Sequence, residues 1–361
     1  MAQSREVVLS GSYMKATDSS NQQLKEMLQQ RAMVVKAIRD FFWQENFLEV
    51  ETPQLVPQPS MEPYLEVFET ALLDQQRQPS RAFLTSSPEF SMKKLLAKDV
   101  GNMFQICKSF RNAEGLSSRH NPEFTILEWY RVGQDYTAIM DDCENLFRFI
   151  GKALGLKTLK FRDYEYDLAE PWERLSVPEA FAKFAGIDLE TMLDESRLKD
   201  VAKQKGYSVG ADSTWEEVYN QIFLNEIEPH LGLEEPCILY DYPTEQAALS
   251  RRKTSDPRLA ERFEFYVAGL ELGNAFSELT DWQEQLARLE ADRQEKIRIG
   301  RTVFDIDMEF IEALKSGMPP TAGIAVGVDR VVMLFLNQTD IQSVLVFPAH
   351  KWWPEVEREN V

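Results

Sequence analysis

Two arginines in this 361-residue chain are placed where they could bind phosphate groups. Arg111 opens the polar stretch RNAEGLSSRHNPEF directly after a predicted buried strand, and Arg330 stands where the strand-like GIAVGVD turns into a helical pattern. A guanidinium fork matches phosphate oxygens, so two forks from separate elements could clamp a polyphosphate and stabilise charge that develops on it. Structural salt bridges are the alternative interpretation, and Asp329 beside Arg330 is compatible with it.

Two carboxylates form a second candidate set. Glu271 and Glu278 lie in ELGNAFSE, inside an alternating pattern that is typical of half-buried strands. Their odd separation places them on opposite faces of a regular strand, so joint use requires a bulge or bend at Gly273. On one face they could hold Mg²⁺ against phosphates, or one of them could bind an ammonium group. The alternative is that the two carboxylates only lie on a solvent-exposed face of the strand and bind no ligand.

Small residues alternate in the strand-like segment before Arg330. Gly323, Ala325 and Gly327 leave one face of this strand almost bare. A bare face lets a ligand approach the backbone, and close packing against a neighbouring helix is equally compatible with it.

Composition limits the partners and the compartment. The formal net charge of −19 argues against wrapping a long nucleic acid or lying on an anionic membrane. The three cysteines are far apart and form no CxxC pair, which argues against a zinc site or a disulfide framework and favours the cytoplasm. No apolar run is long enough to predict a membrane span. Motifs of the GxGxxG, GxSxG and HExxH types do not occur, so side-chain cations would have to hold any phosphates.

The predicted strands are joined by hairpins and loops more than by regular βαβ crossovers. This pattern favours an α+β fold, with an antiparallel sheet flanked by helices, over a doubly wound parallel sheet. The other predicted parts are a flexible tail over 1–20, helices over 22–45, 137–154 and 282–298, a helical insertion over roughly 156–260, and a C-terminal tail over 351–361.

Three segments in order resemble the motifs of class II aminoacyl-tRNA synthetases: FLEVETP, FRNAEGLSSRHNPEFTILEWY and GIAVGVDR. The resemblance implies a class II catalytic core over residues 21–350 and, from the first motif, a homodimer. The lysyl branch is closest, but only 46 residues, predicted to be tail and helix, precede FLEVETP. We therefore expect no anticodon-binding domain and, given the acidic charge, no tRNA acceptor.

A truncated lysyl-type family, the elongation factor P–(R)-β-lysine ligases, resembles the chain more closely in TSSPEF, SFRN, HNPEFTILEWY and KSGMPPTAGIAVGVDR. Ala325 agrees with it, since these ligases have alanine where lysyl-tRNA synthetases have glycine. The resemblance implies activation of (R)-β-lysine by ATP and Mg²⁺ as an adenylate, and transfer to the ε-amino group of a lysine on elongation factor P. The alternatives are a free-standing α-lysine-activating ligase and a non-catalytic, synthetase-like accessory subunit.

The same resemblance implies roles for individual residues. Arg111 and Arg330 would be catalytic, and Glu271 with Glu278 would hold Mg²⁺. The family loop usually reads FRNE, so the intervening Ala113 leaves the position of Glu114 open. The implied ATP-binding residues are Arg111, Asn112, Glu114, Asn121, Glu271, Leu272, Gly327 and Arg330. The implied substrate-binding residues are Ser87, Pro88, Glu89, Tyr130, Asn274, Glu278 and Ala325, with Asn121 also close to the adenylate.

Overall fold

The computed structural model describes residues 18–354 and 356, and an eight-stranded sheet forms its centre. Neighbouring strands pair antiparallel, except for the parallel pairs at the two edges, β1 with β5 and β10 with β9. The predicted α+β architecture is confirmed. The order of the strands is β1 (Leu48–Glu49), β5 (Met103–Phe110), β6 (Glu123–Val132), β13 (Thr321–Gly327), β12 (Leu270–Ser277), β11 (Leu259–Val267), β10 (Cys237–Pro243) and β9 (Glu173–Ser176).

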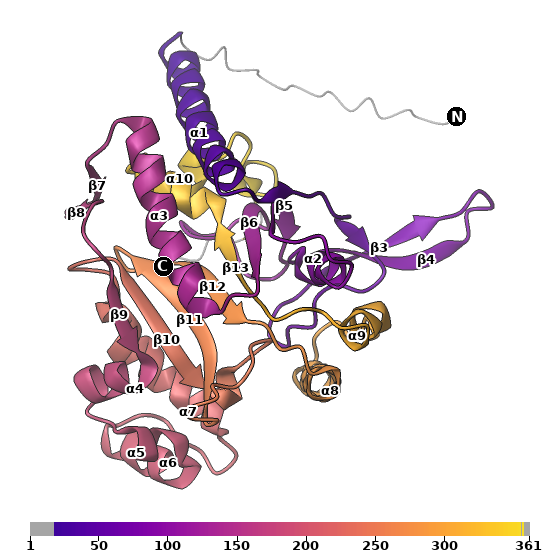
Figure 1. Ribbon diagram of the computed structural model, residues 1–361, viewed down its shortest axis with the longest axis vertical. Helices are drawn as coiled ribbons and strands as arrows, with labels where there is room; N and C mark the ends of the chain where they lie inside the picture. The colour runs from indigo at the N-terminus through magenta and orange to yellow at the C-terminus, as the bar shows by residue number, and fades with distance from the viewer. Residues whose placement is uncertain (1–17, 355, 357–361) are drawn as a thin grey trace, which may run out of the picture.

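One face of this sheet packs against helices. Side chains alternate between the two faces of a strand, so Leu127 and Trp129 on β6 share a face with Ile324 and Val326 on β13. All four are buried in the main hydrophobic core. Figure 1 shows the helices that cover this face. They are α1 (Asp18–Gln44), α3 (Tyr136–Leu154) and α10 (Val328–Phe335).

The opposite face carries the polar and small residues of the same strands. Glu128 pairs with Ala325, and Tyr130 pairs with Gly323, in the register of β6 and β13. Asn274 on β12 continues the row of Glu128 and Ala325. Because cross-strand partners point to the same side, these residues form one surface. This surface is the floor of the site described below.

A second layer closes one end of that surface. Phe90 and Phe310 stack with ring centroids 4.3 Å apart, and both belong to a hydrophobic cluster that also contains Tyr130 and Phe276. The β3–β4 hairpin extends from this layer in Figure 1. The elements of the layer are α2 (Glu89–Leu96), α8 (Trp282–Ile299), α9 (Met308–Lys315), and a three-stranded sheet of β2 (Leu55–Val56), β4 (Pro79–Leu84) and β3 (Phe68–Leu73).

The segment predicted to be a helical insertion contains helices and strands. Its helices bury a separate core around Phe181, Trp215 and Tyr219. Strands β9 and β10 extend the main sheet, and the predicted limit at 260 falls inside β11. The further elements of the segment are the hairpin of β7 (Thr158–Phe161) and β8 (Tyr164–Asp167), and the helices α4 (Val177–Ala180), α5 (Leu189–Leu193), α6 (Glu195–Gln204) and α7 (Trp215–Ile222).

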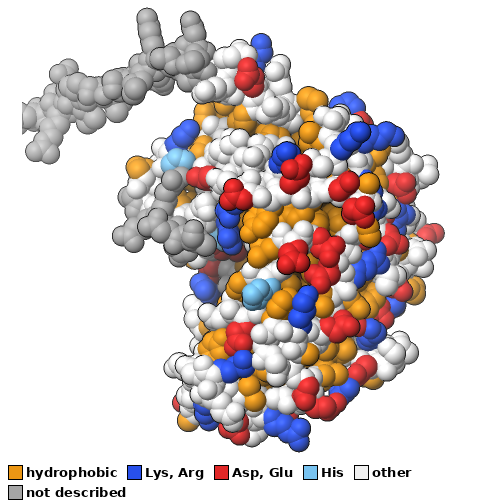
Figure 2. All heavy atoms as spheres, turned by 90° about the vertical axis from the view of Figure 1, so that its left-hand side faces the viewer, with side chains coloured by type: hydrophobic (Ala, Val, Ile, Leu, Met, Phe, Trp, Pro, Cys, Tyr) orange, Lys and Arg blue, Asp and Glu red, His pale blue; other side chains and the backbone are white. Residues whose placement is uncertain are grey.

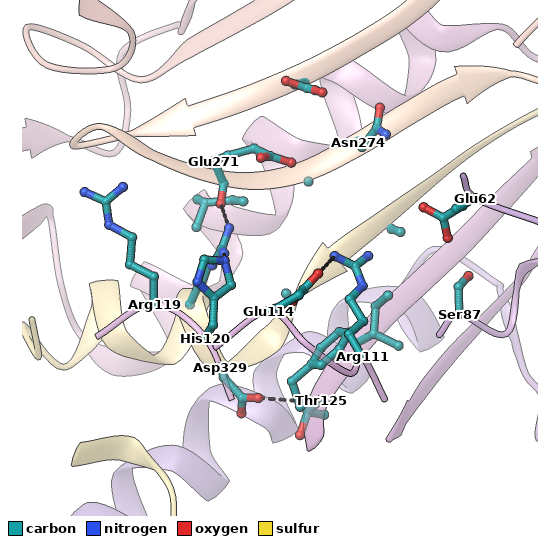
Figure 3. A pocket seen from close by; sticks show the side chains of 18 of the residues that line it. Glu62, Ser87, Arg111, Glu114, Arg119, His120, Thr125, Glu271, Asn274 and Asp329 are labelled. Atoms are coloured by element: carbon teal, nitrogen blue, oxygen red, sulfur yellow. Dashed lines mark hydrogen bonds and ion pairs between the residues drawn. The ribbon is translucent and has the colours of Figure 1, made fainter. Parts of the chain in front are cut away.

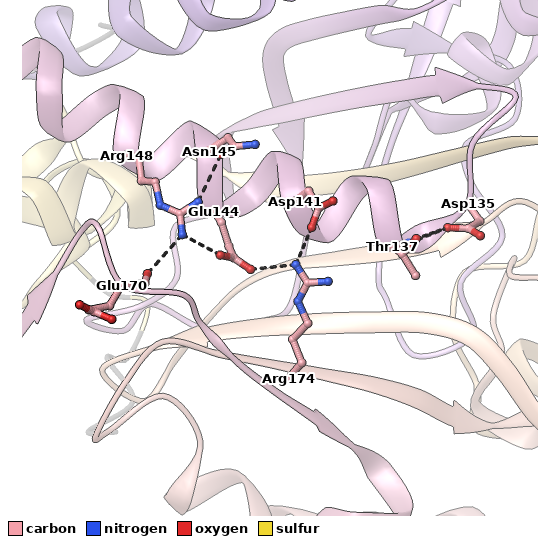
Figure 4. Close-up of polar contacts among 8 residues, drawn as sticks. All are labelled: Asp135, Thr137, Asp141, Glu144, Asn145, Arg148, Glu170 and Arg174. Atoms are coloured by element: carbon pink, nitrogen blue, oxygen red, sulfur yellow. Dashed lines mark hydrogen bonds and ion pairs between the residues drawn. The ribbon is translucent and has the colours of Figure 1, made fainter.

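Ion pairs connect this segment to the main helical layer. Arg174 on β9 lies 2.6 Å from the Asp141 carboxylate and 2.9 Å from that of Glu144, both on α3. Arg148 approaches the other oxygen of Glu144 at 2.9 Å, as Figure 4 shows. Glu144 is buried, so these contacts are less screened than surface pairs and fix β9 against α3.

The termini differ slightly from expectation. Helix α1 already begins at Asp18, so the last residues of the predicted tail over 1–20 are helical. The rest of that tail, and most of the predicted tail over 351–361, lie outside the described residues. No helix within residues 18–354 and 356 has the length and apolar character needed to cross a membrane.

Candidate active site

A cavity of about 360 Å³ lies over the polar face of the sheet. Figure 3 shows side chains from β12, from the loop between β5 and β6, and from the start of α10 converging on it. Small-molecule sites are commonly concave, with a few convergent polar groups. The predicted site residues that line this cavity are Ser87, Glu89, Arg111, Glu114, Asn121, Glu271, Leu272, Asn274, Ala325, Gly327 and Arg330. Those that do not line it are Pro88, Asn112, Tyr130 and Glu278.

The extra residue in the loop after β5 is absorbed by a turn. Ala113 adopts a left-handed φ of 56°, which is uncommon for a residue other than glycine. The Asn112 side chain accepts a hydrogen bond from the Ala113 backbone N–H at 3.0 Å and supports this turn. Glu114 therefore still faces the cavity, with its carboxylate 3.6 Å from the Arg111 guanidinium (Figure 3).

Arg111 presents unused hydrogen-bond donors at the cavity wall. Its guanidinium lies 5.3 Å from the centre of the Phe124 ring, and its buried Nε has no hydrogen-bond partner among the described residues. A buried donor without a partner is costly, so this position favours an anionic ligand. Phe124, which was not among the predicted site residues, also lines the cavity and offers an aromatic face for a nucleobase. Its signal in the sequence was an aromatic residue directly after the polar loop.

Arg330 is held by two contacts at the start of α10. Its Nη1 donates to the backbone carbonyl oxygen of Glu271 at 2.7 Å, and its Nη2 lies 3.2 Å from Nε2 of His120. Burial and the charge of Arg330 lower the pKa of His120, so this imidazole is neutral and accepts at Nε2. The other ring nitrogen then carries the proton and donates to the Ser117 hydroxyl at 3.0 Å. Sequence reasoning did not assign this role to His120.

A β-bulge, which joint use of Glu271 and Glu278 would have required, lies beside Gly273. The register of β11 and β12 shifts where Phe265 pairs with Gly273 and Tyr266 pairs with Glu271, which leaves Leu272 as the extra residue. Glu271 therefore reaches the cavity side of the sheet, where it lines the cavity together with Asn274.

The Glu271 carboxylate is half-buried and accepts no hydrogen bond from any residue in the described part of the chain. Burial, followed by the nearby Glu264, raises the pKa of Glu271 to about 7. Glu264 itself is fully engaged, since it accepts hydrogen bonds from Arg262, Tyr242 and Tyr266. An unpaired carboxylate beside two arginines and a second carboxylate suits a cation that arrives with a polyphosphate.

Glu278 has a different environment from Glu271. It follows the end of β12, and one of its oxygens lies 2.5 Å from the Lys93 ammonium. Lys93 also contacts Glu89 at 2.5 Å. The structure therefore does not bring Glu271 and Glu278 together, and within its described residues no group of three or more acidic, histidine or cysteine side chains is arranged to hold a metal.

Glu128, which sequence reasoning missed, does not line the cavity and lies buried behind Ser87, which does. The Ser87 hydroxyl donates to one of its oxygens at 2.5 Å, and the Tyr130 hydroxyl lies 3.3 Å from the other. Burial, followed by the charge of Glu89, raises the pKa of Glu128 to about 8. Both hydrogen-bond partners are neutral hydroxyls, so the carboxylate can take up a positive charge from a ligand. Its signal in the sequence was an acidic residue inside the apolar run TILEWY.

Two further predicted residues hold parts of the protein together. The Asn121 side chain donates to the Glu123 carbonyl oxygen at 2.6 Å and accepts from the Ala349 N–H at 3.0 Å. Asn274 accepts a hydrogen bond from Arg262 at 3.1 Å. Both still line the cavity, so these bonds fix the wall.

The bare strand face at Gly323 is covered by a side chain. A Cβ atom at this position would lie 2.3 Å from the Tyr130 ring and 3.0 Å from the Glu278 carboxylate, whereas one at Gly327 would meet nothing closer than 3.9 Å. We therefore expect Gly323→Ala to lower the free energy of unfolding by about 1–3 kcal/mol through overpacking. Chemical denaturation measures this change, with Gly327→Ala as the matched control. Equal stability of the two variants would contradict the assigned packing.

Comparison with known proteins agrees with this geometry. The family model for tRNA synthetases class II (D, K and N) matches residues 6–351. The elongation factor P–(R)-β-lysine ligase of Vibrio vulnificus is 39% identical over 327 residues, which cover 90% of this chain and 95% of the relative. The ligases of the same name from Vibrio cholerae and Actinobacillus succinogenes are 39% and 38% identical, each over 89% of this chain and 94% of the relative. The chain therefore belongs to the elongation factor P–(R)-β-lysine ligase family, within the class II tRNA synthetases.

Proposed function

We propose that this protein activates (R)-β-lysine with ATP and transfers it to the ε-amino group of a lysine on elongation factor P. The observation that carries the proposal is one cavity lined by Arg111 and Arg330 and by Glu89 and Ser87, where the Ser87 hydroxyl donates to the buried carboxylate of Glu128 behind it. A substrate with a carboxylate at one end and an ammonium group at the other fits this polarity. The names of the relatives and their nearly full-length similarity support the same assignment.

In the first step, the substrate carboxylate attacks the α-phosphorus of ATP, and the bond from that phosphorus to the pyrophosphate oxygen breaks. The products are a β-lysyl adenylate and pyrophosphate. Negative charge develops on the phosphate oxygens in the transition state. Arg111 and Arg330 are already positioned on the cavity wall, so they stabilise this charge without having to reorganise.

In the second step, the ε-amine of the acceptor lysine attacks the carbonyl carbon of the adenylate. An amide bond forms, the bond between this carbon and the phosphate oxygen breaks, AMP leaves, and the amine proton passes to water. Glu114 lies beside Arg111 on the loop and faces the cavity, where it can orient the incoming amine.

Magnesium would bind at Glu271 in this proposal. The half-buried, unpaired carboxylate of Glu271 fits a hard cation, while the oxygens of Glu264 are occupied by Arg262 and two tyrosines. The ion would neutralise part of the charge of the bound phosphates. Glu278 is not included, because its carboxylate is paired with Lys93.

The distal ammonium of the substrate would bind Glu128. Glu278 was expected to have this role, but its ion pair with Lys93 leaves Glu128 as the buried carboxylate that has only neutral partners. Ala325 and Asn274 occupy the same cross-strand row as Glu128, so they border the substrate chain.

Pyrophosphate exchange tests both the activity and the choice of amino acid. We expect exchange with (R)-β-lysine to exceed exchange with α-lysine, and Ala325→Gly to reduce this preference about tenfold or more, because one methyl group in a pocket changes selectivity by this order. Mass spectrometry of elongation factor P should then detect one added β-lysyl group. Absence of exchange with both amino acids would contradict the activity, and unchanged selectivity of Ala325→Gly would contradict the role of Ala325.

We infer further that tRNA is not the acceptor and that the protein acts in the cytoplasm. The net charge of −19 opposes binding of a polyanion, and Figure 2 shows acidic and basic side chains interspersed over one face of the molecule. The three cysteines are free and buried, which agrees with a reducing compartment. An aminoacylation assay with total tRNA should detect no product.

We also infer that the protein forms a homodimer. Large apolar side chains are exposed on α1 and β1, where the first class motif lies, and such residues favour an interface. Sedimentation at several protein concentrations should report twice the mass of the chain. The exposed residues are Leu24, Leu28, Met33, Trp43 and Leu48.

A further inference from the structure

A segment that follows α10 supports the loop between β5 and β6. It begins with the short 3₁₀ helix Ile341–Val344. The backbone N–H of Ile341 donates to the Ser118 carbonyl oxygen at 2.8 Å, and the N–H of Ala349 donates to the Asn121 side chain at 3.0 Å. Two backbone groups of the segment are therefore bonded to the part of the loop that leads into β6.

The side chain of Gln342 adds a third connection from this segment to the loop. It is buried, and its amide nitrogen donates to the carbonyl oxygen of Ser117 at 3.2 Å and to that of His120 at 3.3 Å. Its amide oxygen lies 3.0 Å from Nδ1 of His350. Because an amide oxygen can only accept, this ring nitrogen donates and fixes the direction in which the amide faces. One buried side chain thus satisfies two backbone carbonyls of the loop.

The two carbonyls belong to the turn that presents His120 to Arg330. The Ser117 hydroxyl closes this turn, since it accepts from the backbone N–H groups of Arg119 and His120 at 3.1 Å each. Arg119 and His120 line the cavity, as Figure 3 shows, and Nε2 of His120 lies 3.2 Å from the Arg330 guanidinium. The position of the turn therefore determines where His120 meets Arg330, and Gln342 ties the turn to the segment after α10.

We propose that Gln342 is a positioning residue for ATP, which holds the turn so that His120 keeps Arg330 in one orientation towards the phosphates. This inference rests on the proposed function. Gln342 is not among the described residues that line the cavity, so it can act on ATP only through the loop. Small displacements of groups that contact a reacting substrate reduce rates strongly. Ser87 and Glu89 also line the cavity but lie outside this loop, so loss of the Gln342 amide affects ATP more than the amino acid.

The kinetics of pyrophosphate exchange test this role. Gln342→Met keeps the length of the side chain, removes the amide and leaves two buried carbonyls without this donor. We expect the KM for ATP to rise about tenfold or more, and the KM for (R)-β-lysine to change by less than about twofold. Gln338→Met is the matched control, because Gln338 is a half-buried glutamine whose amide donates to Leu336 at 3.2 Å, two residues away in its own segment. The control should keep the wild-type KM for ATP.

A double-mutant cycle shows whether Gln342 acts through His120. His120→Ala should raise the KM for ATP by itself, since it removes the group that holds Arg330. Adding Gln342→Met should then have little further effect, because the contact that Gln342 positions is already lost. Effects on kcat/KM for ATP that add fully in the double variant would refute the inference.

Other outcomes separate this inference from its alternatives. A Gln342→Met variant with the KM for ATP of Gln338→Met would refute the inference and leave the proposed function intact. Equal losses for ATP and (R)-β-lysine, with a lower melting temperature, would refute it by assigning Gln342 a purely structural role. If Gln342→Met does not fold, Gln342→Glu keeps the size and the acceptor for His350 and replaces the donor by an oxygen that faces two carbonyls. A wild-type KM for ATP in Gln342→Glu would also refute the inference. Wild-type protein that is inactive with both lysines refutes the proposed function instead.

Discussion

Arg111→Ala should slow pyrophosphate exchange with (R)-β-lysine about a hundred- to a thousandfold, which is the usual effect of removing one preorganised donor from a developing charge. The Arg111 guanidinium stands at the cavity wall over Phe124, and its buried Nε has no hydrogen-bond partner among the described residues. Its donors are therefore available to phosphate oxygens in the transition state. The loss should appear in kcat as well as in the KM for ATP, and steady-state exchange at varied ATP concentration measures both.

Lys108→Ala is the matched control for Arg111→Ala. Lys108 is a cation on β5, three residues before Arg111, and its exposed ammonium lies 3.4 Å from Glu123. Exposed ion pairs contribute little, so this variant should keep nearly the wild-type exchange rate. If both variants lose a comparable share of the exchange rate, the effect is due to positive charge in general. If Arg111→Ala keeps the wild-type rate, Arg111 has no catalytic role.

Glu128→Gln should have the second large effect, on the amino acid alone. Removing one member of a buried charge pair costs about 2–5 kcal/mol, so kcat/KM for (R)-β-lysine should fall by about thirtyfold or more. The KM for ATP should hardly change, because Glu128 is buried and is hydrogen-bonded to Ser87 and Tyr130, away from both arginines that line the cavity. Glu123→Gln, at the exposed start of the same strand, is the control.

The pH dependence of Glu128→Gln provides an independent check. Since burial raises the pKa of Glu128 from 4.5 to about 8, binding of an ammonium must displace a proton near neutral pH. The KM for (R)-β-lysine in the wild type should therefore decrease as pH rises from about 6 to 8, and Glu128→Gln should lose this dependence. An unchanged pH profile, or a wild-type KM, would show that the ammonium binds elsewhere.

The effect of Glu128 on stability should have the opposite pH dependence: rising pH should strengthen substrate binding but weaken the contribution of Glu128 to the free energy of unfolding. Between pH 4.5 and about 8 the folded protein holds the Glu128 proton more tightly than the unfolded chain does, so this residue makes the free energy of unfolding fall as pH rises. Glutamine does not ionise. Relative to the wild type, Glu128→Gln should therefore become more stable as pH rises from 5 to 8.5, and urea denaturation at the two pH values measures the difference.

The elements that carry the chemistry could be predicted from local patterns. The alternation of apolar and polar residues predicted β12. The change from a strand pattern to a helix pattern indicated Arg330, and the polar loop after an apolar run indicated Arg111. The odd spacing of Glu271 and Glu278 indicated only that their joint use would require a bulge or bend at Gly273, and a bulge lies beside this residue. Such inferences succeed because a strand's period and a bulge depend on residues that are close together in the chain.

The partners of the buried charges could not be predicted in this way. Glu278 was expected to hold the substrate ammonium, which stays a prediction, but the sequence did not indicate that Lys93 pairs with Glu278 or that Ser87 donates to Glu128. A pattern along one strand shows which face a side chain occupies, and says nothing of the side chains that other elements bring to that face.

By itself, the sequence determined the α+β class, the order of the three motifs, the family and the two arginines, since each depends on local spacing or on matched segments. Only the tertiary structure decided that Tyr130 covers Gly323, that neutral His120 supports Arg330, and that Lys93 forms an ion pair with Glu278. These contacts join residues distant in the chain, and whether a buried charge is paired depends on every element that packs around it.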